Sequence, residues 1–363
     1  MAEPAVARLT IDLDAVAHNF HVLKNEAAGA EAAPVVKADG YGLGAAQVGR
    51  RLWAEGARSF FVARLAEGEA LRAALGRERP ATIYVLDGFT AGAGPRLAAA
   101  ALIPALMSLP QVAAAQAWAT ANRGGAEVAL HVDTGMNRQG LTPPEARALA
   151  QGGGLRGLEV SLLMSHLGSA TTPNDPRNSS QLQRFLDVRG AFPEARASLA
   201  ASAGVFLGPD YRFDLVRPGV SLYGGGPEER PDARLRAAAT LTAPIVDIRN
   251  LRPGDIVGYG SSVQADRPLR VAVAAAGYAD GVIRAAKAGG YAWLDGARRP
   301  LLVVNMDLIV LEIGNARATV GDPVELLGPN ALLDDLAAAG ATVAHEVLVR
   351  LSRRAERVYV GGV

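Results

Sequence analysis

Lysine is rare in this chain, and one lysine stands in a distinctive setting. Only three of the 37 basic residues are lysines. Lys24 follows an amphipathic segment and Lys287 lies in a polar, glycine-containing stretch, so we expect both on the surface. Lys37 follows the apolar run Pro34-Val35-Val36 and precedes Ala38-Asp39-Gly40. Because shielding from water favours the neutral amine, Lys37 is a candidate to form a Schiff base with an aldehyde.

Further polar side chains stand where apolar, strand-like runs end. His166 and Ser202 lie at such ends, and Arg138 follows another run through a glycine-containing turn. The last run carries Arg217. Glycines and hydroxyls at strand ends offer N–H and O–H donors to a phosphate. Lysine, aldehyde and phosphate together describe pyridoxal phosphate (PLP). The same lysine chemistry would serve a Schiff-base aldolase, so both interpretations stand on these residues alone.

Several other classes of chemistry are disfavoured by the composition. The chain has no cysteine, which removes disulfides, thiolate metal sites and cysteine nucleophiles. His18 and His21 have no third ligand near them in the sequence, so we predict no metal site. The net charge of +1 gives no sign of a nucleic acid or membrane partner. We predict a soluble, cytoplasmic, globular protein.

The order of the predicted elements indicates how these side chains meet. Near-continuous apolar runs alternate with helical stretches, which favours a (β/α)₈ barrel with the polar residues at its mouth. A doubly wound open sheet is the alternative, although no GxGxxG follows a first strand. The expected strands are 33–38, 59–64, 82–87, 102–107, 127–133, 158–165, 195–202 and 213–223. Among the helices, the expected buried positions are Val16, Phe20 and Leu23; Val48 and Leu52; and Leu182, Phe185 and Leu186.

The alternation of apolar runs with helical stretches ends at about residue 230. The polar stretch 227–234 (PEERPDAR) predicts a linker. Beyond it, short runs divided by glycine and proline predict an antiparallel β domain. One helical segment, 331–340, interrupts this domain, and residues 8–13 (RLTIDL) form a lone strand near the start of the chain.

The motifs resemble those of the alanine racemase family. VVKADGYGLG is similar to that family's cofactor-attachment signature, and DTGMNRQG, SHLGSA, RPGVSLYG, VGYGSS, GYADG and NMD follow in the family's order. The resemblance implies a TIM-like eight-stranded α/β barrel (12–232) and a C-terminal, mainly antiparallel β domain (233–363) joined by the N-terminal strand (1–11). It also implies a homodimer in which each active site is shared between one barrel and the partner's β domain.

The resemblance further implies PLP-dependent interconversion of L-alanine and D-alanine by two catalytic bases. Lys37 would hold PLP and act on one face of the substrate Cα, and Tyr259 from the other subunit would act on the opposite face. Because an unperturbed tyrosine has a pKa near 10, the family assists it with a hydrogen-bonded chain, here Tyr259, His166 and Arg217. Arg217 would face the pyridine nitrogen and keep it unprotonated, since a guanidinium only donates hydrogen bonds.

The remaining site residues also follow from the resemblance. The expected phosphate contacts are Tyr41, Ser202, Gly219 and Val220. Arg138 would lie near both the phenolic oxygen of PLP and the substrate carboxylate. The other expected substrate contacts are Met306, Asp307 and Tyr278. The reaction would supply D-alanine for peptidoglycan in a bacterium or serve alanine catabolism.

Two positions depart from the family pattern. Many members carry a carbamylated lysine where this chain has His131, and histidine forms no stable carbamate. We therefore expect a bound anion such as chloride to orient Arg138. The family's C-terminal phosphate-binding tyrosine aligns near Arg353, which leaves Arg353 and Tyr359 as alternatives for that contact.

Other functions of related folds remain as alternatives. The decarboxylases of ornithine or diaminopimelate type use a cysteine, which this chain lacks. The PLP carrier proteins, which serve homeostasis without known turnover, lack a β domain and the VGYG tyrosine. A racemase of another small amino acid, such as serine, is the nearest alternative.

Overall fold

The chain divides into two compact units in the computed structural model, which describes residues 6–122, 125–259 and 263–362. Residues up to His18 together with Tyr223–Gly362 form one unit, and Asn19–Leu222 form the other. The first helix, α1 (Leu13–Glu26), passes from one to the other. Its apolar face, Val16, Phe20 and Leu23, is buried as predicted. No helix within the described ranges is long and apolar enough to cross a membrane.

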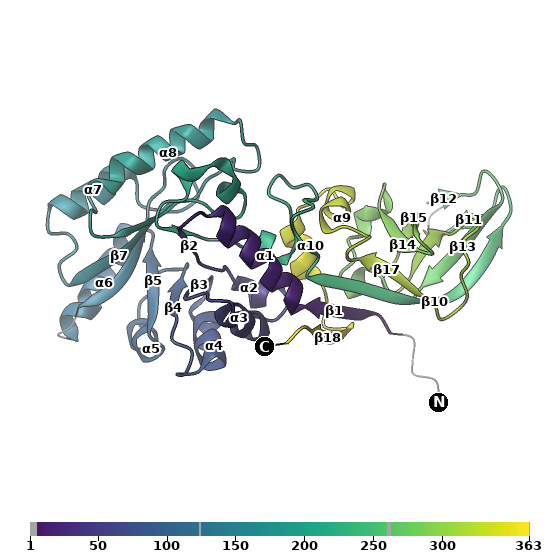
Figure 1. Ribbon diagram of the computed structural model, residues 1–363, viewed down its shortest axis with the longest axis horizontal. Coiled ribbons are helices and arrows are strands. Elements are labelled where there is room, and N and C mark those ends of the chain that lie inside the picture. Colours follow the sequence, from purple (N-terminus) through teal and green to yellow (C-terminus); the bar gives the residue numbers. More distant parts are fainter. Residues whose placement is uncertain (1–5, 123–124, 260–262, 363) are drawn as a thin grey trace. The chain divides into compact units, whose positions relative to one another are not determined.

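The unit Asn19–Leu222 is a parallel barrel that its strand pairings close. Figure 1 shows its strands together with the helices α3 to α8. Strands β3 to β8 pair side by side in chain order, and β9 pairs with β2. Isolated bridges Val35–Phe61 and Ala201–Arg217 join this pair to the two ends of the larger sheet. The eight strands confirm the predicted (β/α)₈ fold. They are β2 (Glu31–Ala32), β3 (Ser59–Val62), β4 (Thr82–Val85), β5 (Leu102–Leu106), β6 (Ala126–His131), β7 (Leu158–Met164), β8 (Arg196–Ser198) and β9 (Leu215–Val216).

Helices connect these strands, and three of them begin at a residue whose side chain caps the helix. Ser108, Thr142 and Asp175 accept backbone N–H groups at the starts of α6, α7 and α8, and each is followed by proline in the first turn. In α3, Val48 and Leu52 are fully buried, as predicted. The helices are α2 (Lys37–Tyr41), α3 (Ala45–Ala54), α4 (Leu65–Leu75), α5 (Gly94–Ala99), α6 (Leu109–Ala121), α7 (Pro143–Gln151) and α8 (Pro176–Arg189).

The predicted buried face of α8 is partly wrong. Phe185 is buried, but Leu186 is 42% exposed. The buried stripe runs instead through Asn178, Gln181, Phe185 and Val188. Two polar residues, Asn178 and Gln181, occupy it because their amide groups donate hydrogen bonds to backbone carbonyls, which offsets part of the cost of burying them.

The other unit is built on an antiparallel barrel. Strands β10, β13, β16, β15, β14 and β17 pair in a closed ring. The N-terminal strand β1 (Arg8–Asp12) adds to β10 antiparallel, and β18 (Glu356–Val360) adds to β1 parallel, which confirms that the β domain takes up the N-terminal strand. The other strands are β10 (Ala239–Leu251), β11 (Ile256–Val257), β12 (Val263–Gln264), β13 (Leu269–Ala274), β14 (Tyr291–Leu294), β15 (Ala297–Val304), β16 (Ile309–Glu312) and β17 (Pro323–Leu327).

Two helices follow β17, where the sequence predicted one. The predicted segment 331–340 contains α9 (Leu333–Ala339). A second helix, α10 (Ala344–Arg350), was not predicted. It has only seven residues, and just Val347 and Leu348 among its large side chains are fully buried, so its apolar pattern is too short to identify from the sequence.

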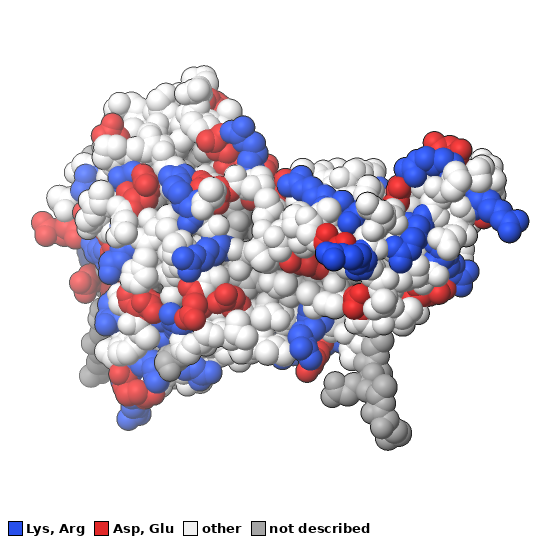
Figure 2. Space-filling model, turned by 45° about the vertical axis from the view of Figure 1, so that its right-hand side comes forward, with Lys and Arg blue, Asp and Glu red and all other residues white. Residues whose placement is uncertain are grey.

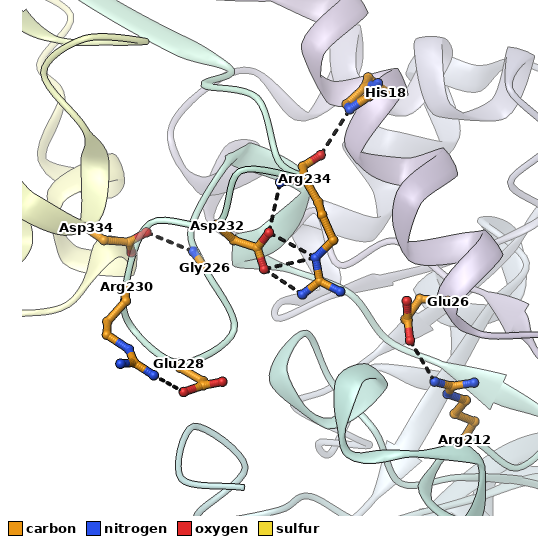
Figure 3. A network of polar contacts seen from close by, with 9 residues as sticks. All are labelled: His18, Glu26, Arg212, Gly226, Glu228, Arg230, Asp232, Arg234 and Asp334. Carbon is orange, nitrogen blue, oxygen red and sulfur yellow. Dashed lines mark hydrogen bonds and ion pairs between the residues drawn. The ribbon is translucent and has the colours of Figure 1, made fainter.

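The stretch predicted as a linker is irregular and held by polar contacts (Figure 3). The guanidinium of Arg234 pairs with Asp232, and its carbonyl accepts a bond from His18 at 3.1 Å. Upstream, the N–H of Gly226 donates to the buried carboxylate of Asp334 at 2.9 Å. Over the face seen in Figure 2, basic and acidic side chains are interspersed.

Candidate active site

Lys37 begins a left-handed turn that follows β2 and the isolated bridge at Val35. The following residues, Ala38, Asp39, Gly40 and Tyr41, all have φ between 52° and 63°. This conformation costs about 1–2 kcal/mol for each residue other than glycine, so neighbouring groups must hold it. The carboxylate of Glu67 accepts the N–H of Ala38 at 2.9 Å. Backbone strain of this kind is concentrated at functional sites.

The surroundings of Lys37 favour its neutral form. Burial lowers the pKa of its amine, the positive charge of Arg138 lowers it further, and Glu67 offsets part of the effect. A lowered pKa increases the fraction of uncharged amine, which is the nucleophilic form. The setting therefore suits the Schiff-base chemistry predicted from the sequence.

Arg217 lies in the barrel interior and is only 3% exposed. Its Nη1 donates to Ser198 Oγ at 2.5 Å, and its Nη2 donates to the Ser165 carbonyl at 2.5 Å. The Ser198 hydroxyl in turn donates a hydrogen bond to the Leu215 carbonyl at 2.6 Å. Burial lowers the pKa of Arg217 to about 9, which still leaves the guanidinium charged at neutral pH.

His166 stands beside this guanidinium. Its Nδ1 lies 3.4 Å from Arg217 Nη2. Burial lowers the pKa of His166 well below its ordinary value, and the charges of Arg217 and Arg138 lower it further. A neutral ring whose Nδ1 accepts from Arg217 carries its proton on Nε2. His166 can therefore donate one hydrogen bond onward from that atom.

A donor cluster surrounds Ser202 and Gly219. Ser202 Oγ accepts the N–H groups of Gly219 at 2.8 Å and Ser221 at 3.4 Å, and Val220 begins a short 3₁₀ turn between them. Tyr41 is buried, which raises the pKa of its hydroxyl and keeps it a donor at neutral pH. A Cβ on Gly219 would lie 2.4 Å from the Tyr41 hydroxyl. Only glycine leaves space there, and the hydroxyls and amides suit a phosphate.

Arg138 follows a tightly bonded turn after β6. Asp133 Oδ1 accepts three consecutive backbone N–H groups, those of Gly135, Met136 and Asn137, at 2.8–3.1 Å. Arg138 itself is exposed, and its charge acts on both Lys37 and His131.

His131, at the family's usual lysine position, is buried and lies 3.3 Å from the Gln139 amide nitrogen through its Nδ1. The bound anion that we expect beside Arg138 stays a prediction.

The buried His131 gives the fold an expected dependence on pH. Burial, with the charges of Arg217 and Arg138, lowers the pKa of His131 to about 4. Because the unfolded chain binds this proton near pH 6.5, stability should fall as the pH drops from 6.5 towards 4. The full loss from this residue is about 3 kcal/mol. His131→Gln should reduce the slope of unfolding free energy against pH, measured by urea unfolding.

His166 has a pKa shifted in the same direction, so part of the slope should remain in the His131→Gln variant. The control is Thr120→Ser, an exposed substitution that changes no titratable group and should leave the slope unchanged. An unchanged slope in His131→Gln would show that His131 is not held neutral by the fold.

The other predicted site residues lie in the second unit. Tyr259, Tyr278, Met306 and Asp307 line one open cavity of about 960 Å³. Tyr259 is 83% exposed, and Met306 is 52% exposed. The last residues of the VGYGSS motif, 260–262, lie outside the described residues. Arg353 is exposed, and Tyr359 lies on β18 opposite Ile11.

The structure thus groups the predicted residues into two sets, one in each unit. Three residues that contact the predicted site residues or the turn after Lys37 were not predicted: Glu67, Ser198 and Gln139. Glu67 occupies the capping-box position three residues after Arg64, which is a sequence signal. Ser198 is four residues before Ser202 on the same strand-like run, so alternation would place both towards one face.

Comparison with known proteins assigns the family. The alanine racemase N-terminal domain matches residues 11–227, and the C-terminal domain matches residues 238–359. An alanine racemase of Methylobacterium nodulans is 44% identical over 98% of this chain and 96% of its own. A catabolic alanine racemase of Mesorhizobium japonicum is 42% identical over 99% and 94%.

A solved structure also supports the assignment to this family. The alanine racemase of Bartonella henselae, described with covalently bound pyridoxal phosphate, superposes with a TM-score of 0.92 at 33% identity, covering 98% of this chain and 100% of that one. The sequence motifs, the two-unit fold and both domain matches agree. This chain belongs to the alanine racemase family.

Proposed function

We propose that this protein is a PLP-dependent alanine racemase that interconverts L-alanine and D-alanine. The observation that carries the proposal is the half-buried Lys37, which stands at the start of a strained turn and whose amine is driven towards its neutral form. The Bartonella henselae relative, described with covalently bound pyridoxal phosphate, supports the choice of cofactor. The Mesorhizobium japonicum relative is named catabolic. Because the reaction is reversible, the proposal covers both supply and breakdown of D-alanine.

The residues of the barrel unit fit this cofactor. Lys37 would hold its aldehyde carbon, and Arg217 would present a donor to its ring nitrogen. The phosphate would be held by the hydroxyls of Tyr41 and Ser202 and by the backbone at Gly219 and Val220. When bound, PLP supplies an electron-withdrawing ring that makes the Cα–H of an attached amino acid acidic.

Racemisation requires that a proton leave one face of Cα and return on the other. We assign the two faces to Lys37 and Tyr259. The geometry supports a role for His166 in assisting Tyr259. Because Nδ1 of His166 accepts a hydrogen bond from Arg217, its Nε2 carries a proton that it can donate to the Tyr259 oxygen. Such a bond would stabilise the phenolate as Tyr259 gives up its proton.

The substrate end of the site would be formed by Arg138, Met306, Asp307 and Tyr278. Arg138 supplies a positive charge for the alanine carboxylate. The other three line the open cavity beside Tyr259. A small amino acid is favoured if a second copy of the chain covers this cavity, because the covered space would then be narrow.

We infer that the active form is a homodimer in which one subunit's Tyr259 completes the other subunit's site. The exposed aromatic and apolar side chains around the cavity support this, since such groups commonly mark an interface. A cytoplasmic location, predicted from the sequence, also remains part of the proposal.

Racemisation itself is tested directly. The PLP-loaded protein should convert either enantiomer to the same equal mixture of L-alanine and D-alanine. The circular dichroism of each starting enantiomer should therefore fall to zero. L-serine should lose its signal much more slowly. Persistence of the L-alanine signal at stoichiometric protein would overturn the proposed function, and faster loss with serine would replace the substrate.

The shared site predicts complementation between two inactive variants. In a mixed dimer of Lys37→Ala and Tyr259→Phe subunits, one of the two sites receives both wild-type residues. Random mixing should therefore restore about a quarter of the wild-type rate. Co-expression with two different affinity tags allows the mixed dimer to be isolated and assayed. If both residues served the same subunit's site, the mixture would stay inactive.

A further inference from the structure

Two loops of the β unit carry residues of the proposed substrate end, and they bond to each other through the backbone. The first, residues 277–281, contains Tyr278. The second, residues 305–308, contains Met306 and Asp307. The N–H of Tyr278 donates to the Asn305 carbonyl at 2.9 Å, and the N–H of Ala279 donates to the Met306 carbonyl at 3.0 Å.

The packing of these loops is tight. A Cβ on Gly277 would lie 2.3 Å from the carbonyl oxygens of both Asn305 and Met306. Gly281, at φ +108°, ends the first loop, and a Cβ there would lie 2.5 Å from the Arg350 carbonyl. The segment 350–354 therefore packs directly against the loop that carries Tyr278.

Arg354, in that third segment, bonds to both loops at once. Its Nε and Nη2 donate to the two carboxylate oxygens of Asp280 at 2.9 and 3.0 Å. Its Nη1 donates to Asp307 Oδ1 at 2.5 Å. The Asp280 side chain is only 3% exposed, whereas that of Asp307 is 60% exposed. One guanidinium thus joins a buried, fixed carboxylate to an accessible one.

We propose that Arg354 is a positioning residue for alanine turnover: it fixes the Met306–Asp307 loop against the Tyr278 loop and so sets the substrate end of the site. This rests on the proposed function, which places those loops next to the substrate. Asp280 serves as the anchor, because it also accepts the N–H of Gly277 at 2.8 Å. Asp307 is the group whose position Arg354 controls.

The chemistry of arginine suits this role. Its planar fork presents a bidentate pair of donors to Asp280 and a further donor to Asp307. The two carboxylates raise the pKa of Arg354, Asp307 more than Asp280, so it stays charged. Lysine presents one compact ammonium and cannot reproduce this fork. Arg354→Lys should therefore restore little of what Arg354→Gln loses.

The kinetic test separates positioning from simple support of the fold. Arg354→Gln should raise KM for alanine about tenfold with kcat changed by less than about threefold, as expected when binding rather than chemistry is weakened. In an Asp307→Asn background, Arg354→Gln should raise KM by less than about twofold, because the carboxylate that Arg354 positions is already gone. Arg249→Gln, which removes an exposed ion pair with Asp247 in the same unit, is the control and should leave KM unchanged.

Hydrogen exchange of the full-length chain tests the same contact without any turnover. Peptides over 277–281 and 305–308 should exchange faster in Arg354→Gln than in the wild type or in Arg249→Gln. Asp307→Asn, which keeps the buried Asp280–Arg354 pair, should accelerate 305–308 alone. Unchanged exchange in both variants, or an equal KM effect in both backgrounds, would overturn the proposal. If the wild type fails to racemise alanine, the proposed function is wrong, and the exchange result still decides whether Arg354 holds the loops.

Discussion

Replacing Lys37 with alanine should lower racemisation of alanine by at least about 10⁴-fold, because one change removes both the attachment of the cofactor and one of two proposed bases. The variant should also fail to retain the absorbance of PLP through gel filtration. Borohydride treatment of wild-type protein should fix PLP covalently, and peptide mapping should locate it at Lys37. PLP should attach to Lys37 rather than to another lysine because the pKa of this amine is lowered.

The chain supplies matched controls for this experiment, since its only other lysines are Lys24 and Lys287. Both are exposed, so Lys24→Ala and Lys287→Ala should keep the cofactor and the activity. Retention of a borohydride-reducible adduct in Lys37→Ala would move the attachment site to one of these two lysines.

The second large effect is expected for Tyr259→Phe. The variant should bind PLP as the wild type does, because Lys37 and the phosphate contacts are intact. Racemisation should fall by about 10²–10⁴-fold, the usual contribution of a general acid–base group. Deuterium exchange of Cα–H should then survive for the single enantiomer whose proton faces Lys37, as followed by NMR.

The outcome for the two enantiomers decides the role of the tyrosine. If Tyr259→Phe still exchanges both at wild-type rates, Tyr259 is not a base. Tyr211→Phe is a suitable control, because Tyr211 lies in a short 3₁₀ turn of the barrel unit and belongs to no part of the proposed site. It should leave both exchange and racemisation unchanged.

Much of the architecture could be predicted because it depends on simple patterns. Buried parallel strands need near-continuous apolar runs, and such runs recur eight times before residue 223. Lys37 was identified because lysine is scarce and this one follows an apolar run. The two-base roles, the dimer and the residues of the second unit came from the resemblance, since no spacing in the sequence connects Tyr259 with Lys37.

Other features depend on contacts that the local sequence does not encode. The first strand was expected over 33–38, but the regular strand is Glu31–Ala32 and the chain turns left-handed after Lys37. Glu67, about 30 residues away, helps to hold that turn. The last predicted strand, 213–223, is likewise regular only over Leu215–Val216, and Val220–Tyr223 forms a 3₁₀ turn.

The pairing of β1 has a consequence for how the protein is made. Arg8 lies opposite Thr242 on β10 and Glu356 on β18. The whole (β/α)₈ barrel is therefore inserted between the first strand of its neighbour and the partners of that strand. During synthesis β1 must wait for both partners, because β10 follows only after the whole barrel and β18 comes later still. The barrel can fold as a unit while translation continues, whereas truncation near the C-terminus would leave β1 with an open edge prone to aggregation.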